Sequence, residues 1–130
     1  MRLFEGYAVV WDRYGKCTAG VVRIVPRSIT LPRDVDGILA LDDHKGPEVG
    51  RVVEAEVDNE GIWTTIELDG IPDDVDELGV SPELVRATVH RDEITAGVLH
   101  RVALVDVPAF GTTLRAVRPA STPKPEEIEE

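Results

Sequence analysis

The alternation of apolar and polar side chains predicts that most of this chain forms β-strands. In residues 62–68 (IWTTIEL), every second side chain from Ile62 to Leu68 falls on one face, and the side chains between them fall on the other. Residues 50–57 (GRVVEAEV) alternate in the same way, and the intervening sequence Asp-Asn-Glu-Gly supplies the glycine that a hairpin turn favours. The pattern therefore predicts a β-hairpin over residues 50–68.

Three further segments have the β-branched and aromatic composition that favours strands. They are residues 3–11 (LFEGYAVVW), residues 21–25, which Pro26 terminates, and residues 99–107 (LHRVALVDV), which Pro108 closes. Gly6, inside the first segment, indicates a bulge or the close approach of another backbone. The polar and glycine-rich residues 12–20 predict a loop.

Signals for helices are few. Pro72 and the three acidic side chains after it suit the start of a helix, which predicts one helical turn over residues 73–78. Together these segments predict a mainly β domain with one or two short helices (α+β), mostly antiparallel and closed as a β-barrel. Residues 1–117 are expected to form this single domain. Residues 118–130, rich in proline and glutamate with almost nothing to bury, predict a disordered or loosely attached tail.

The composition agrees with one globular domain and argues against several classes of protein. A chain of 130 residues with 42% hydrophobic residues is long enough to bury a core. Its single cysteine, Cys17, rules out an internal disulfide, and with three histidines we expect neither a zinc cluster nor a cofactor. No apolar run reaches membrane-spanning length and the N-terminus has no signal-peptide core, so we expect a soluble, intracellular protein.

The net charge of −11 is concentrated in the middle of the chain. Residues 1–33 carry +4, residues 34–77 carry −13 and residues 78–130 carry −2. Binding to a nucleic-acid backbone needs clustered Lys and Arg. The acidic middle therefore argues against nucleic acid as the main ligand, and it is compatible with solubility or with a basic protein partner.

A candidate functional residue, His44, follows the apolar run 38–41 at the end of a predicted strand. The sequence LALDDHKGPEVGRV (39–52) places it directly after Asp42 and Asp43 and before a Gly-Pro turn. Strand ends are where a rigid scaffold presents reactive side chains, and an imidazole beside carboxylates suits a general base. The alternative is that His44 is an ordinary surface histidine.

Ser81, in the sequence GVSPEL (79–84), is a candidate nucleophile. A serine hydroxyl becomes reactive when a nearby base removes its proton, and a third group has to orient that base. His44 and Ser81 would supply the first two parts of this arrangement. Because Ser81 precedes Pro82 and Glu83, the alternative is that its hydroxyl caps a helix.

Four stretches, in this order, resemble those of the phage prohead (head maturation) proteases, which are distantly related to the herpesvirus assemblins. They are FEGYAVVWD (4–12), LALDDHKGPEVGRV (39–52), GVSPEL (79–84) and VALVDVPAFGTTLRAV (102–117). The resemblance implies the β-barrel fold of these proteases, with His44 as general base and Ser81 as nucleophile. The chain departs from the family in having VPRSI (25–29) where PGAF is usual, and in a segment before the serine, residues 70–80, that is too short for the usual helix.

The resemblance also implies a third, orienting residue near the start of the last strand, an acid in the phage enzymes and a second histidine in the viral ones. Arg101 stands at the position expected for the acid, and His100, one residue earlier, is the best substitute. Neighbouring residues on a strand face opposite ways, so His100 serves only if a bulge or a register slip intervenes. Asp43 and Glu83 are the other candidates, and Gly111 is a candidate for the backbone N–H of an oxyanion hole.

By this resemblance the chain is expected to be a serine endopeptidase of phage capsid maturation, located in the host cytoplasm within the prohead or virion. Its partners would be the scaffold and the major capsid protein as substrates, with no nucleic acid or membrane involved and a homo-oligomer as an option. The alternative is a catalytically silent structural protein of the virion with the same fold, favoured by Arg101 and by the short segment before Ser81. An unrelated β-barrel that binds a small ligand would explain the predicted hairpin but not the four ordered stretches.

Overall fold

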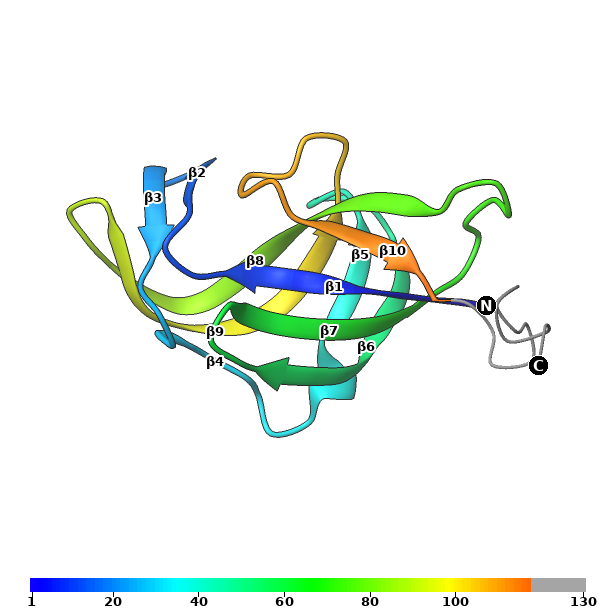
Figure 1. Cartoon of the computed structure of the whole chain (residues 1–130), viewed down its shortest axis with the longest axis horizontal. Helices are drawn as coiled ribbons and strands as arrows, with labels where there is room; N and C mark the ends of the chain where they lie inside the picture. Colours follow the sequence, from blue (N-terminus) through cyan, green and yellow to red (C-terminus); the bar gives the residue numbers. More distant parts are fainter. Residues whose placement is uncertain (118–130) are drawn as a thin grey trace, which may run out of the picture.

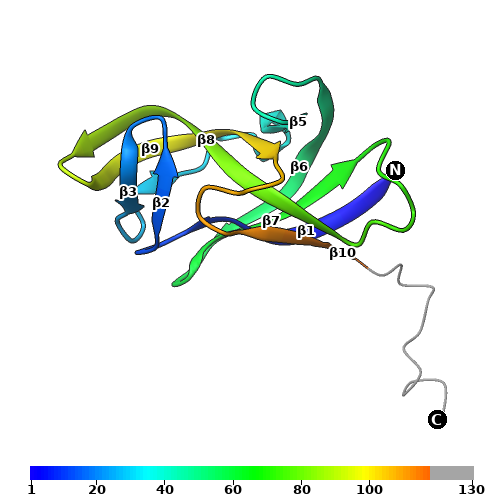
Figure 2. The ribbon, with the colours of Figure 1, turned by 90° about the horizontal axis from the view of Figure 1, so that it is seen from above.

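The computed structural model describes residues 1–117, so the predicted tail at 118–130 lies outside the described residues. The described chain is built almost entirely from β-strands, which Figures 1 and 2 show from two directions. The strands are β1 (Arg2–Val10), β2 (Tyr14–Cys17), β3 (Gly20–Ile24), β4 (Ile29–Thr30), β5 (Leu39–Asp42), β6 (Glu48–Val57), β7 (Gly61–Leu68), β8 (Glu77–His90), β9 (Glu93–Leu104) and β10 (Thr113–Ala116).

Seven of these strands close into a β-barrel, which confirms the predicted mainly β architecture. The order around the barrel is β9-β5-β6-β7-β1-β10-β8, and the pairing of β8 with β9 completes the circle. Closure gives hydrogen-bond partners to backbone groups that an open sheet would leave unpaired at its edges. The other three strands lie outside the circle, with β3 and β4 paired to β9 and β2 paired to β3.

The sheet is mostly antiparallel, but β9 is an exception. It runs parallel to β3, β4 and β5, and in the last of these pairs Leu39 lies opposite Arg101. A parallel pair needs a long connection between its strands. Here three further strands of the barrel, β6, β7 and β8, and their turns separate β5 from β9, so no local pattern in the sequence predicts this pairing.

The predicted hairpin over residues 50–68 is confirmed. β6 and β7 pair antiparallel from Gly50 opposite Leu68 to Val57 opposite Ile62, with a bulge between Val52 and Glu54. The side chains expected on one face are all buried: Ile62, Thr64, Ile66 and Leu68. The period-two pattern therefore identified the face of this hairpin that fills the barrel.

The close approach expected at Gly6 is also confirmed. A Cβ atom at this position would lie 2.3 Å from the carbonyl oxygen of Thr113, on the neighbouring strand β10. The bulge of β1 against β7 lies slightly further along, between Tyr7 and Val9. A glycine at position 6 thus allows the last strand of the barrel to pack against the first.

The helical turn predicted over residues 73–78 was wrong, and the described part of the chain has only one short 3-10 helix, η1 (Val35–Gly37). Carbonyl groups of this segment accept hydrogen bonds from residues distant in the sequence. The Arg2 guanidinium donates to Pro72 O and Val75 O at 2.7 and 2.8 Å. The carbonyl of Asp76 accepts from the N–H of Ala116. Long-range partners therefore override the local helix signal. The loop expected over 12–20 is likewise in part a strand, β2.

The β8–β9 pair extends beyond the barrel, with β2 and β3 beside its far end (Figure 2). The buried core combines side chains of the barrel with side chains from these outer strands, including Val22 and Ile24 of β3. None of the helical segments within residues 1–117 is long and apolar enough to cross a membrane. The outer strands matter for function because they form one wall of the cleft described next.

Candidate active site

His44 lies at the tip of the tight turn that joins β5 to β6. The N–H of Asp42 donates to Pro47 O at 2.9 Å and closes the turn. A Cβ atom on Gly46 would lie 1.4 Å from Asp42 O, so the turn has room only for glycine at this position. The Gly-Pro sequence therefore fixes the geometry of the turn that presents His44.

Asp43 connects this turn to the barrel. Its N–H donates to Leu104 O, at the end of β9, at 2.9 Å. Its carboxylate accepts the N–H of His44 at 2.7 Å, and its backbone has a positive φ of 66°. The Asp43 carboxylate thus binds the backbone of His44 and stabilises the turn. It makes no hydrogen bond to the imidazole ring.

Ser81 lies within β8, where it is opposite Ala103 of β9. The residue is 3% exposed, and its Oγ accepts a hydrogen bond from the N–H of Ala109 at 3.1 Å. Thr112 holds the loop after β9 in place, because its hydroxyl donates to Val80 O at 2.8 Å. The helix-capping interpretation of Ser81 is therefore wrong, since the serine is an interior residue of a strand.

Glu83 contacts the ring of His44. Two residues apart on one strand, Ser81 and Glu83 point to the same face of β8. The Glu83 Oε2 atom lies 2.7 Å from Nδ1 of His44, and the two side chains are 23% and 48% exposed. A carboxylate accepts hydrogen bonds, so the contact makes Nδ1 of His44 the donor and leaves Nε2 outside this contact.

His44, Ser81 and Glu83 all line one cleft of about 540 Å³. Its far part is mostly apolar and is formed by the turn between β2 and β3 together with residues of the β8–β9 pair and the loop after β9. The remaining lining residues are Lys16, Cys17, Thr18, Ala19, Pro82, Leu84, Ala87, Val89, Ile94, Ala109 and Phe110. Within this cleft, hydrogen bonds join His44 to Glu83 and Ala109 to Ser81.

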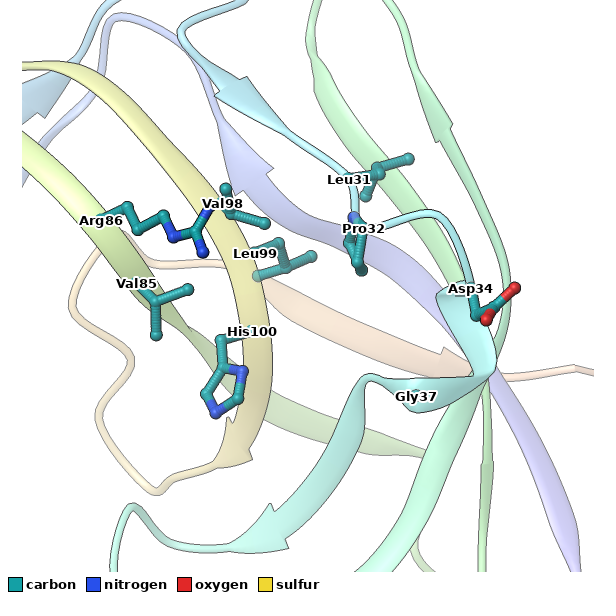
Figure 3. Close-up of a pocket in the computed structure, with 9 residues that line it drawn as sticks. All are labelled: Leu31, Pro32, Asp34, Gly37, Val85, Arg86, Val98, Leu99 and His100. Atoms are coloured by element: carbon teal, nitrogen blue, oxygen red, sulfur yellow. The ribbon is translucent and has the colours of Figure 1, made fainter.

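His100, the residue expected to complete the site, lies elsewhere. The bulge that its role required is present, since Glu83 pairs with Arg101 while Leu84 pairs with Leu99, which leaves His100 without a partner on β8. Its side chain nevertheless lines a second groove, which Figure 3 shows. His44, Ser81 and Glu83 line one cleft, in which a hydrogen bond joins His44 to Glu83 while Ser81 is bonded to Ala109, and His100 does not line that cleft.

The backbone donor beside the serine is Ala109, which the sequence did not single out. The N–H of Gly111, the residue named from the sequence, donates to Pro108 O at 3.2 Å and so closes a turn. That turn follows Pro108 and directs the preceding N–H of Ala109 toward β8. The Pro-Ala-Phe-Gly stretch indicates a turn in the sequence. It does not indicate which N–H group of that turn faces the serine.

The resolved pKa shifts fall outside this cleft. The Tyr7 hydroxyl donates to Asp58 at 2.8 Å and holds the pKa of that carboxyl below its ordinary value, while the pKa of Tyr7 is raised. The hydrogen bond from Tyr14 to Asp92 likewise raises the pKa of Tyr14. Within residues 1–117, no group of three or more His, Cys, Asp or Glu side chains has an arrangement suited to a metal ion.

Comparison with known proteins adds no family to this picture. No model of a known protein family, no curated protein and no solved structure matches the chain. What the chain presents is a closed β-barrel with a serine, a histidine and a carboxylate in one cleft, and a functional assignment has to begin from those groups.

Proposed function

We propose that the protein is a serine endopeptidase of phage capsid maturation, which cleaves scaffold or the N-terminal segment of the major capsid protein within the prohead. The observation that carries this proposal is the 2.7 Å contact between His44 Nδ1 and Glu83 Oε2, in the cleft that Ser81 also lines. The ordered resemblance of four stretches to the prohead proteases supports the choice of substrate. A Ser-His-carboxylate set is the composition needed for acyl transfer.

Each residue of the set has a role in this proposal. Ser81 Oγ attacks the carbonyl carbon of the scissile peptide bond while His44 Nε2 takes the hydroxyl proton. The imidazolium of His44, stabilised by Glu83, then donates this proton to the leaving amine as the C–N bond breaks, and an acyl ester remains on Ser81. A water molecule, deprotonated by His44, hydrolyses the ester, and the serine regains its proton.

The loop after β9 has a supporting role. The N–H of Ala109, 3.1 Å from Ser81 Oγ, lies where it can donate to negative charge that develops on the carbonyl oxygen during attack. Such donors are worth most when they are fixed before the reaction, and the hydrogen bond from Thr112 to Val80 O keeps this loop against β8. In this assignment Ala109, and not Gly111, takes the place of the oxyanion donor.

The direct test is processing of the capsid precursor by the wild-type chain and by Ser81→Ala and His44→Ala. Both variants are expected to lose at least about 10³-fold in rate. His90→Ala is the matched control, because His90 is exposed at the far end of β8 and does not line the cleft. Processing by both site variants at the wild-type rate would refute the assignment of the site.

A second candidate function is a structural component of the virion with the same barrel and no activity. It is favoured by the resting contacts of Ser81, which is almost fully buried and held by a backbone N–H, an arrangement that also serves a purely structural serine. Mass spectrometry of mature particles separates the two functions. A full-length chain at stoichiometric copy number beside unprocessed capsid protein supports the structural role, whereas a fragmented or absent chain supports the protease.

A further inference from the structure

A second groove of about 430 Å³ lies away from the candidate active site (Figure 3). Strands β8 and β9 form one wall, and the segment from β4 to η1 forms the other. Its lining residues are Leu31, Pro32, Asp34, Gly37, Val85, Arg86, Val98, Leu99 and His100. Val85 of this groove follows Leu84 of the active-site cleft on β8, and the two sites share no lining residue.

Two irregularities of the β8–β9 pair direct polar side chains to this groove. His100 is the unpaired residue of the first bulge. Arg86 lies in the second, between the pairs Val85 with Val98 and Thr88 with Ala96, and has a positive φ of 55°. A positive φ is costly for arginine, and bulges commonly re-aim a side chain. The backbone is therefore distorted where Arg86 and His100 enter the groove.

The guanidinium of Arg86 and the imidazole of His100 are exposed and make no hydrogen bond or ion pair with another residue of 1–117. Most other arginines of the described chain do bind a carboxylate, an amide oxygen or a carbonyl, namely Arg2, Arg13, Arg23, Arg27, Arg51 and Arg115. Arginine presents its donors in a fork that matches a carboxylate, and an imidazole N–H donates in either charge state. This end of the groove therefore suits acidic side chains.

The rest of the groove suits apolar and cationic groups of a ligand. Leu31, Pro32 and Val98 provide an apolar surface, and Asp34 provides a carboxylate on the wall opposite Arg86 (Figure 3). A matching ligand combines acidic groups, a branched apolar side chain and one cation. An isolated anion satisfies only the first of these three requirements.

We propose that this groove binds the acidic segment of the chain itself, residues 124–130, with the sequence KPEEIEE. The segment contains four glutamates for Arg86 and His100, Ile128 for the apolar surface, and Lys124 for Asp34. Six residues lie between Val117 and Lys124, and the seven steps from one to the other span at most about 25 Å when extended. The occupant is this segment of the same copy, with a segment from a second copy as an outcome that the test distinguishes, and the proposal does not depend on proteolysis by Ser81.

Disulfide trapping in the full chain tests the proposal. In a Cys17→Ser background, Ile128→Cys is combined either with Val85→Cys in the groove or with Val107→Cys, an 86% exposed control outside it. At low salt we expect trapping at position 85 to be about tenfold faster than at 107, and Arg86→Glu to remove most of this preference. The mass of the trapped product shows whether the segment comes from the same copy or from another.

Equal trapping rates at positions 85 and 107 would overturn the proposal, as would a preference for position 85 that Arg86→Glu leaves intact. Circular dichroism of each variant establishes that the barrel is folded before trapping rates are compared. A second measurement avoids new cysteines: backbone amide NMR shifts of Arg86 and His100 are compared between the wild-type chain and a variant with all four tail glutamates changed to Gln. Unchanged shifts at both residues contradict docking in the groove.

Discussion

The carboxylate of Glu83 binds Nδ1 of His44 at 2.7 Å, although the two residues are 39 positions apart along the chain. The contact joins the rigid strand β8 to the tip of the turn between β5 and β6. In the proposed mechanism this contact orients the imidazole so that Nε2 can serve as the base for Ser81.

Glu83→Gln tests this contact directly. The amide keeps the size of the side chain but removes the charge that stabilises the imidazolium, so kcat/KM for the capsid precursor is expected to fall by about 10²–10⁴-fold. Glu54→Gln, at an exposed position of β6 outside the cleft, is the matched control and should behave as wild type. Equal activity of the two variants would remove Glu83 from the proposed mechanism.

The Gly46→Ala substitution is expected to disturb the turn that carries His44. The new Cβ atom would lie 1.4 Å from Asp42 O, a backbone atom that cannot move without opening the turn. We expect a loss of about 1–3 kcal/mol in the free energy of unfolding, measured with urea. Gly37→Ala is the control, because a Cβ there meets no atom within 4 Å, and a change within about 0.5 kcal/mol is expected. A similar effect of both substitutions would show that the turn tolerates a side chain at position 46.

The barrel core should respond strongly to truncation of Ile66. This side chain is fully buried on β7, so Ile66→Ala removes packed methyl groups and leaves a cavity at a cost of about 2–5 kcal/mol in the free energy of unfolding. Val107→Ala, at a position that is 86% exposed, should change it by less than about 0.5 kcal/mol. Urea unfolding curves followed by tryptophan fluorescence measure both, and a loss below 1 kcal/mol for Ile66→Ala would contradict the packing described.

The acid sensitivity of the fold should depend in part on Asp58. The Tyr7 hydroxyl, followed by the N–H groups of Glu60 and Gly61, lowers the pKa of Asp58 in the folded chain. The ionised form therefore stabilises the fold above the unfolded pKa of about 4, and this contribution disappears as the pH falls through the folded value. Tyr7→Phe should have a shallower loss of stability on acidification, measured as the urea midpoint from pH 7 to pH 2. Parallel curves for the two chains would exclude this linkage.

Cys17 offers a probe of the cleft because its half-buried thiol lies on the same lining as Ser81. A bulky thiol reagent attached to Cys17 should occupy the cleft and lower kcat/KM by at least about tenfold, while a methyl-sized adduct should have a smaller effect. The same reagent should not change the activity of Cys17→Ser from its untreated value. Full activity of the bulky adduct would show that substrate does not enter along this wall.

The fold could be predicted from the sequence wherever the pattern is local. The alternation over residues 50–68 identified both strands of the hairpin and their buried face, because each side of this hairpin keeps one environment along its length. β8 escaped prediction for the opposite reason. Only Val80 and Ser81 of this strand are buried, its last six residues are exposed, and bulges interrupt its pairing with β9, so the sequence has no steady period.

The irregular pairing of β8 with β9 also explains why the sequence predicted only part of the candidate site. His44 was identifiable because the Asp-Asp-His-Lys-Gly-Pro sequence marks a turn after an apolar strand. Glu83 could be named only as one alternative, because its shared face with Ser81 follows from β8 being a strand at that point. His100 was favoured by its position near the last strand, but the side chain of the bulged residue lines a different groove. The direction in which a bulge sends a side chain depends on backbone torsions that composition does not reveal.

The place of β10 in the barrel has a consequence for biosynthesis. This strand lies between β1 and β8, so the first strand of the chain acquires its last neighbour only from residues 113–116. While the chain emerges from the ribosome, the exposed borders of β1 and β8 remain open to unwanted association with other nascent chains. Ribosome-stalled chains that end before β10 should therefore need a chaperone to stay dispersed.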